Sequence, residues 1–216
     1  MTDAIAASAN RVEEVRRDIV DAILRGEIRP GEAVPALRIA RQYGVAPATA
    51  REIMLALHAN RLIVVERNHA PRIVVPTPAW FLAVVAEASG LSAICADLGI
   101  AQATATQRAF FARECQRVRT SWTDSFEAQG PAVRGIWELF KLLADYSGNA
   151  DLARFQNEKW PAIALGFLIL RIPRNPKMLH MALDGLADAM RVGDRAEGVA
   201  IVRDLYDFVI AVRIDV

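Results

Sequence analysis

The stretch GVAPATAREIMLALHANRL, residues 44–62, begins with a glycine turn and continues as an amphipathic helix. Apolar residues recur in it at the spacing i, i+3, i+4 and i+7, which places them on one buried stripe. They are Ala50, Ile53, Met54 and Leu57. The opposite face is small or plain, with Pro47, Ala48, Arg51, Glu52 and Leu55. Because small residues in the first turns allow close approach, the stretch predicts a helix that enters the major groove of DNA.

The residues on either side predict a winged helix-turn-helix. A helix is expected over 11–25, with Asn10 as its cap, and a second short helix over 35–43. After the quoted helix, the β-like runs LIVVE (62–66) and RIVV (72–75) predict a hairpin. The composition changes after this hairpin, so we place the domain boundary near residue 77.

From residue 79 onward, helical patterns follow one another without a convincing strand. We expect helices at 79–89, 91–98, 102–128, 131–147, 151–170, 176–192 and 194–213. Pro161 is expected to kink or split the fifth of them. The sequence therefore predicts a mainly α protein. A winged helix-turn-helix (three helices plus a β-hairpin) occupies residues 1–77, and an all-helical effector-binding and dimerisation bundle of six or seven helices occupies residues 78–216.

Charge is concentrated locally. The chain is 53% apolar and 24% charged with a net charge of +1, so it can build a core and is not a polycation. Residues 35–72, however, contain six arginines and two glutamates. Nucleic-acid binding must therefore come from this local patch.

The cysteines and the apolar runs indicate the compartment. Cys95 and Cys115 have no metal-type spacing and are expected to be buried, reduced thiols, as in a reducing cytoplasm. The first ten residues lack the pattern of a secretory signal. The longest apolar run, WPAIALGFLIL (160–170), is shorter than the roughly 20 residues that span a bilayer. We expect a soluble cytoplasmic protein without a membrane partner.

Four motifs in the first third of the chain resemble those of one family. They are GEIRPGE (26–32), the IA…YGV turn (39–45), TARE (49–52) and NRLI (60–63). In this order they resemble the DNA-binding domain of the GntR family of bacterial transcription regulators. The resemblance implies a double-stranded DNA operator as the partner.

The resemblance also implies which residues contact DNA, with some departures. The family often has base-reading arginines where Pro47 and Leu37 stand, and a wing glycine where Ala70 stands. Arg51 matches the family directly, and Arg38 is only the neighbour of the family position. The implied DNA-contacting residues are Arg38, Pro47, Ala48, Thr49, Arg51, His69 and Arg72. The plain helix face implies an operator read more through phosphate contacts and DNA shape.

The second part of the chain resembles the all-helical effector domain of the FadR-like (FCD) branch of that family. The matching motifs are WELFKLLADYSGNADL (137–152) and LADAMRVGDRAEGVAIVRDLYDFV (186–209). Many members of this branch hold a divalent metal with one Asp and three His. The corresponding positions here are Trp137, Lys141 and the neighbourhoods of Leu183 and Leu205. We therefore expect no metal and no cofactor.

These replacements predict a different effector pocket. Leu183 and Leu205 would make it drier, and Trp137 would offer a stacking surface. Lys141 lies one helical turn from Trp137 and would hold a carboxylate, a phosphate or a thioester-bearing acid. The expected effector-binding residues are Trp137, Lys141, Asn157, Leu183, Leu205 and Tyr206. Two plainer alternatives remain, namely a surface lysine and a tryptophan that belongs to the core.

Three classes of function follow from these patterns. The first is a homodimeric repressor that binds a palindromic operator and responds to a small organic effector, an acid or an acyl thioester. The second is a dimerising interaction protein with weak DNA binding and no effector. The third, an enzyme, is disfavoured because the sequence has no Ser-His-Asp set, phosphate loop or metal cluster.

Overall fold

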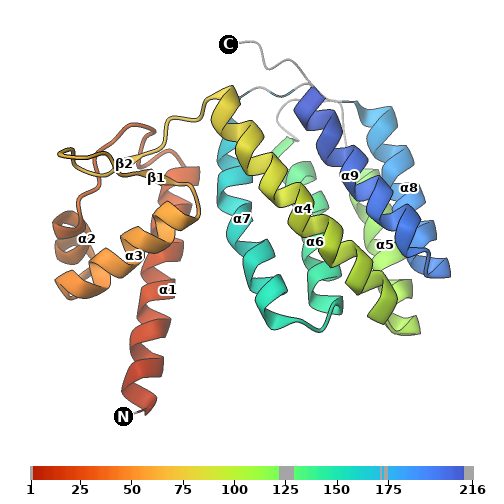
Figure 1. The fold of residues 1–216 in the computed structure, drawn as a ribbon, viewed down its shortest axis with the longest axis horizontal. Helices are drawn as coiled ribbons and strands as arrows, with labels where there is room; N and C mark the ends of the chain where they lie inside the picture. Colours follow the sequence, from red (N-terminus) through yellow and green to blue (C-terminus); the bar gives the residue numbers. More distant parts are fainter. Residues whose placement is uncertain (1, 122–128, 171, 173–174, 212–216) are drawn as a thin grey trace. The chain divides into compact units, whose positions relative to one another are not determined.

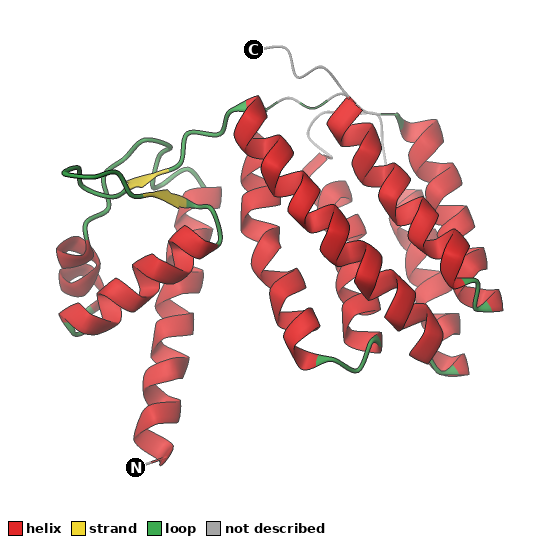
Figure 2. Cartoon of the chain, in the orientation of Figure 1, coloured by secondary structure: helices red, strands yellow, loops and turns green. Residues whose placement is uncertain are grey.

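The computed structural model describes residues 2–121, 129–170, 172 and 175–211. The chain forms two compact units that divide between Thr77 and Pro78. In the described part, the first unit combines helices with a two-stranded sheet and the second is built of helices (Figure 2). The predicted fold class is confirmed.

The first unit is a three-helix core with a hairpin (Figure 1). Its elements are α1 (Thr2–Leu24), α2 (Ala36–Tyr43), α3 (Pro47–Ala59), β1 (Ile63–Val64) and β2 (Arg72–Ile73). Helix α3 packs against both α1 and α2 and buries its predicted stripe. The expected helix start at Asn10 is wrong, because α1 continues back to Thr2 through alanine-rich sequence that favours helix.

A tight turn joins α2 to α3. Gly44 has a φ of 62°, in the left-handed region, and its N–H donates to the carbonyl oxygen of Ala40. The N–H of Val45 donates to the same oxygen at 3.1 Å. The chain is extended at Ala46, and Pro47 then takes the first helical position, where its missing N–H costs nothing. This turn fixes the direction in which α3 leaves α2.

The hairpin is a short antiparallel wing. Ile63 pairs with Ile73 and Val64 with Arg72. The segment before α2 joins its edge, because the N–H of Val34 donates to the carbonyl of Pro71 at 2.8 Å. The wing is therefore tied to the helical core by backbone hydrogen bonds on one side.

The second unit is a helical bundle. Its described helices are α4 (Pro78–Gln102), α5 (Ala105–Ser121), α6 (Gln129–Tyr146), α7 (Ala150–Ile169), α8 (Pro176–Val192) and α9 (Arg195–Ala211). Helix α4 packs against α6, α7 and α9, while α5 packs against α6 and α8. The helices expected at 79–89 and 91–98 are one helix, since Gly90 is tolerated in its middle. Residues 122–128 of the expected helix 102–128 lie outside the described residues.

Helix α4 is the central element of this bundle. It is long and apolar enough to cross a bilayer, although its sequence contains no uninterrupted apolar run of that length. Within its 18-residue apolar window, however, 44% is buried inside the protein. Gly166 lets α7 approach it closely, because a Cβ there would overlap the ring of Phe81. Helix α7 continues through Pro161 without being split. These contacts are those of a core helix.

Candidate DNA interface and effector cavity

Helix α3 presents to solvent the face that the sequence predicts for a DNA groove. Pro47, Ala48 and Arg51 are exposed, and Thr49 is half-buried. Leu55 extends this face one turn further and is 68% exposed. The face has small side chains at its start and a single cation, so the backbone of the first turn can come close to base edges.

Arg51 is the most available cation on this face. Its guanidinium has no hydrogen bond or ion pair with any residue that the structure describes. Arg41 on α2 and Arg67 in the wing are likewise exposed and without such partners. The sequence reasoning did not select Arg41 and Arg67. The sequence indicates them only through the excess of arginine in residues 35–72, which does not distinguish arginines that form ion pairs from those that do not.

Arg38 is held by an acidic neighbour. One of its Nη atoms lies 2.6 Å from Oε1 of Glu32 and donates to the carbonyl of Ala33 at 3.2 Å. The backbone N–H of Arg29 and the guanidinium of Arg38 lower the pKa of the Glu32 carboxyl. The Glu32 carboxylate partly neutralises Arg38, and Nη1 is the only guanidinium nitrogen with a partner among the described residues, so Nε and Nη2 stay available to a phosphate.

The two expected wing residues also have internal partners. Arg72 is exposed, and its Nη1 donates to the carbonyl of Gly31 at 3.0 Å. His69 lies near the tip, with Nδ1 3.1 Å from the carbonyl oxygen of Arg67. Asn68 beside it has a φ of 64°, which shapes the turn. The tip is therefore a polar surface with its backbone fixed by the turn.

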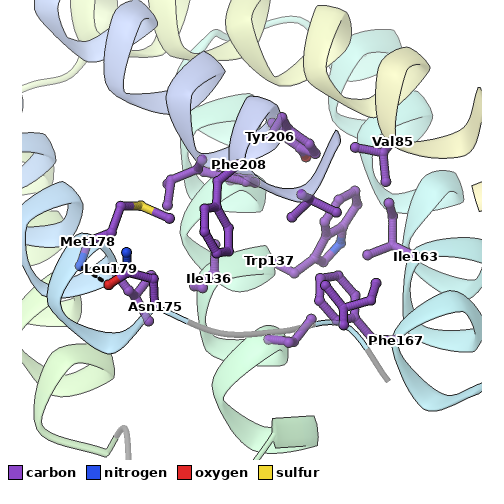
Figure 3. A pocket seen from close by; sticks show the side chains of 15 residues that line it. Val85, Ile136, Trp137, Ile163, Phe167, Asn175, Met178, Leu179, Tyr206 and Phe208 are labelled. Carbon is purple, nitrogen blue, oxygen red and sulfur yellow. Dashed lines mark hydrogen bonds between the residues drawn. The ribbon is translucent and has the colours of Figure 1, made fainter. Parts of the chain in front are cut away.

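The bundle contains an apolar cavity of about 110 Å³. Side chains from α4, α6, α7, α8 and α9 and from Ile172 line it (Figure 3). Its aromatic members are Trp137, Phe140, Phe167, Tyr206 and Phe208. No lining residue in the described part of the chain carries a charge. The cavity therefore favours an apolar occupant.

The hydroxyl of Tyr206 is already engaged behind the cavity. It lies 2.9 Å from Oγ of Ser92, which also accepts a hydrogen bond from Nε2 of Gln156 at 2.9 Å. Ser92 and Gln156 are fully buried. Burial raises the pKa of Tyr206 well above its usual value. The ring of Tyr206 stacks on Phe140 at 5.5 Å, so Tyr206 offers the cavity its ring rather than its hydroxyl.

Three of the six residues expected to bind an effector line this cavity. They are Trp137, Leu205 and Tyr206. The structure does not bring Lys141 there: its Nζ lies 2.7 Å from the Asp145 carboxylate on the surface of α6. The physical reason is that a step of four residues also turns the helix by about 40°, enough to take the lysine off the cavity face.

Asn157 and Leu183 are also placed elsewhere. Asn157 is exposed on α7, and its neighbour Gln156 is the buried amide. Leu183 faces a separate groove between α5 and α8. Sequence reasoning missed Asn175, which lines the cavity at the start of α8. The Asn-Pro pair at 175–176 is typical of a helix start, which predicts that Asn175 caps α8 but not that it lines a cavity.

Metal-binding chemistry finds no support in the described residues. No group of three or more His, Cys, Asp or Glu lies together there in a way that could hold an ion.

Cys95 and Cys115 are both buried and unpaired with one another, and burial raises their pKa to about 11 and about 12. Both are therefore protonated thiols at neutral pH.

A winged helix-turn-helix followed by a helical bundle with an internal cavity is an architecture in which one unit can bind DNA and the other a small molecule. Residues 11–73 match the family described as "Bacterial regulatory proteins, gntR family". The first unit therefore contains a DNA-binding domain of the GntR family.

Solved structures share the fold over nearly the whole chain. E. coli McbR/YncC is 15% identical, with a TM-score of 0.66 over 91% of this chain and 93% of that one. A GntR transcriptional regulator from Rhodococcus sp. RHA1 is 18% identical, with a TM-score of 0.63 over 94% of this chain and all of that one. The comparison with curated proteins found no match.

Proposed function

We propose that the protein is a cytoplasmic repressor of the FadR-like (FCD) branch, which binds a palindromic operator as a homodimer. A small effector in the bundle cavity changes its affinity for DNA. The observation that carries this proposal is the apolar cavity of about 110 Å³ in the unit that follows the DNA-binding unit. A ligand that prefers one conformation of the protein shifts the population that binds DNA.

In this proposal the DNA-binding unit uses two kinds of contact. Pro47, Ala48, Thr49 and Arg51 enter the major groove with the start of α3, where their exposure supports them. The remaining three residues, Arg38, His69 and Arg72, contact the sugar-phosphate backbone or the minor groove from positions beside α3. Specificity then depends on few base contacts and on DNA shape.

We propose the outward face of α4 as the dimer interface. Ile94 on this face is 51% exposed although α4 is the most apolar long helix described. Gly90, one turn away, has open space where a Cβ would stand, so no contact with the described part of the chain accounts for a glycine there. A glycine in mid-helix costs about 1 kcal/mol relative to alanine, and close approach of a second helix would offset this cost.

Operator selection tests the proposal. Selection from random duplexes with the full-length protein should yield a palindrome, and analytical ultracentrifugation should show one dimer on each duplex. Recovery of an unrelated or non-palindromic pool would instead favour the alternative, a dimerising interaction protein with weak DNA binding and no effector. The selected duplex then serves in all later measurements of DNA affinity.

A further inference from the structure

We infer that the cavity binds an uncharged, mainly apolar small molecule that carries one hydrogen-bond acceptor. This inference rests on the proposed function only in treating the cavity as the effector site. It replaces the expectation of an acid or an acyl thioester with a ligand class taken from the lining residues. Three properties of the cavity carry it: its size, the absence of charge among its described lining residues, and the amide of Asn175 at its rim.

The size of the cavity limits the ligand. At about 110 Å³ the cavity is more than large enough for a water molecule, which needs roughly 10–15 Å³. Drug-sized ligands occupy pockets of several hundred Å³. A single ring with a short substituent therefore fits, whereas a coenzyme A thioester or a long acyl chain does not.

The lining residues that the structure describes disfavour a charged ligand. Every lining side chain described is aliphatic or aromatic, with Asn175 as the one amide and Tyr206 turned to the Ser92 hydroxyl. The cation proposed from sequence, Lys141, is paired with Asp145 outside the cavity. An ion without a partner in such surroundings loses several kcal/mol of hydration free energy. Rings such as those of Trp137 and Phe167 favour a neutral aromatic partner instead.

Asn175 supplies the polar contact. Its Oδ1 accepts a hydrogen bond from the backbone N–H of Met178 at 3.0 Å and caps α8. Its amide nitrogen has no hydrogen-bond partner among the described residues and lies on the Phe208 side in Figure 3. Because the oxygen is occupied, the side chain of Asn175, which is exposed, is left as a donor at the solvent-facing rim. A carbonyl or ether oxygen on the ligand would accept this hydrogen bond.

Three matched probes test this ligand class: acetophenone, ethylbenzene and benzoate. All three contain one benzene ring. Acetophenone carries a neutral hydrogen-bond acceptor, ethylbenzene carries no acceptor, and benzoate carries a negative charge. By calorimetry on the full-length protein without DNA, acetophenone should bind about three- to ten-fold more tightly than ethylbenzene, the worth of one neutral hydrogen bond. Benzoate should not bind. Tighter binding of benzoate than of acetophenone, or no binding of any probe at millimolar concentration, would overturn the inference.

Variants locate the binding. Asn175→Asp keeps an oxygen to cap α8 but removes the amide donor, so acetophenone should fall to the affinity of ethylbenzene while ethylbenzene stays unchanged. Ile136→Trp fills the cavity and should abolish both. Lys141→Ala is the control and should change nothing, whereas probe binding that depends on Lys141 contradicts the inference. An unchanged thermal midpoint without ligand shows that each variant folds.

The same probes separate this inference from the proposed function. If acetophenone binds as described but leaves the affinity for the selected operator unchanged, the ligand class stands and the regulatory role of the cavity fails. If no palindromic operator is found yet the probes bind with the stated order, the cavity chemistry again stands by itself. Failure of probe binding with intact operator binding refutes the inference alone.

Discussion

Replacing Arg51 by alanine tests the DNA interface directly, because no described residue depends on this side chain for a hydrogen bond or an ion pair. It is exposed on α3 and has no partner among the described residues. Arg51→Ala should therefore leave the free energy of unfolding unchanged within about 0.5 kcal/mol. Any effect on DNA binding then reports on the complex and not on stability.

The expected effect follows from counting phosphate contacts. Each phosphate neutralised on duplex DNA contributes about −0.9 to the slope of log affinity against log salt, and a homodimer has two copies of Arg51. Arg51→Ala should make this slope shallower by about 1.8. Over a four-fold rise in salt, the unmodified protein should then lose about twelve-fold more affinity than the variant.

Fluorescence anisotropy with the selected operator at a series of salt concentrations measures this slope. Arg203→Ala is a matched control: it removes the same charge from an exposed position on α9 with no partner among the described residues. The control should keep the unmodified slope. Equal slopes for the unmodified protein and for Arg51→Ala, or equal changes in both variants, would refute the assigned role of Arg51.

Three further results are expected. Ile94→Glu should convert the homodimer to monomers in ultracentrifugation. The control Met181→Glu, at a 66% exposed position on α8, should remain a dimer. A dimer that survives Ile94→Glu would show that the interface lies elsewhere. Ser92→Ala removes the hydroxyl that joins Tyr206 and Gln156, and it should lower the free energy of unfolding in urea titrations by about 2–4 kcal/mol. A decrease of less than about 1 kcal/mol would contradict the buried hydrogen-bond network. Cys95 and Cys115, with pKa values raised by burial to about 11 and about 12, should not react with a disulfide reagent at pH 8 until the protein unfolds, and immediate labelling contradicts their burial. Because unfolding returns both thiols to their ordinary pKa, the stability that they contribute is complete below about pH 8.5 and is lost as pH rises toward 11 and 12.

The DNA-binding unit was largely predictable because its signals are local. The spacing of Ile53 and Leu57 defines the buried stripe of α3, and the turn at Gly44 and the cap-free start at Pro47 are readable from residue type alone. What sequence could not show is that Arg38 is paired with Glu32, since the two side chains meet through the path of the chain between them.

The bundle was predictable in class but not in detail. Helical spacing predicted most of the helices. Gly90 was predicted to separate two helices, but α4 continues through it and packs against α6, α7 and α9. The cavity depends on how five helices meet, which no local pattern encodes. Trp137 and Leu205, selected from the motifs, line the cavity, and their role in binding an effector stays a prediction. The position of Lys141 depends on a rotation of about 40° along α6, and Asn175 lies at the start of α8, outside the matched motifs.

The continuity of α4 has a mechanical consequence. Val85, which touches the cavity, stands seven residues after Pro78, the first residue of the bundle, and this is about 10 Å along an unbroken helix. Two turns of unbroken helix move as a nearly rigid body, so a displacement at Val85 also displaces Pro78. If the proposed effector regulation operates, a ligand that displaces Val85 displaces the start of α4 at Pro78, where the second unit begins; a glycine pair within these two turns should then weaken the effect of the ligand on DNA affinity without changing ligand binding.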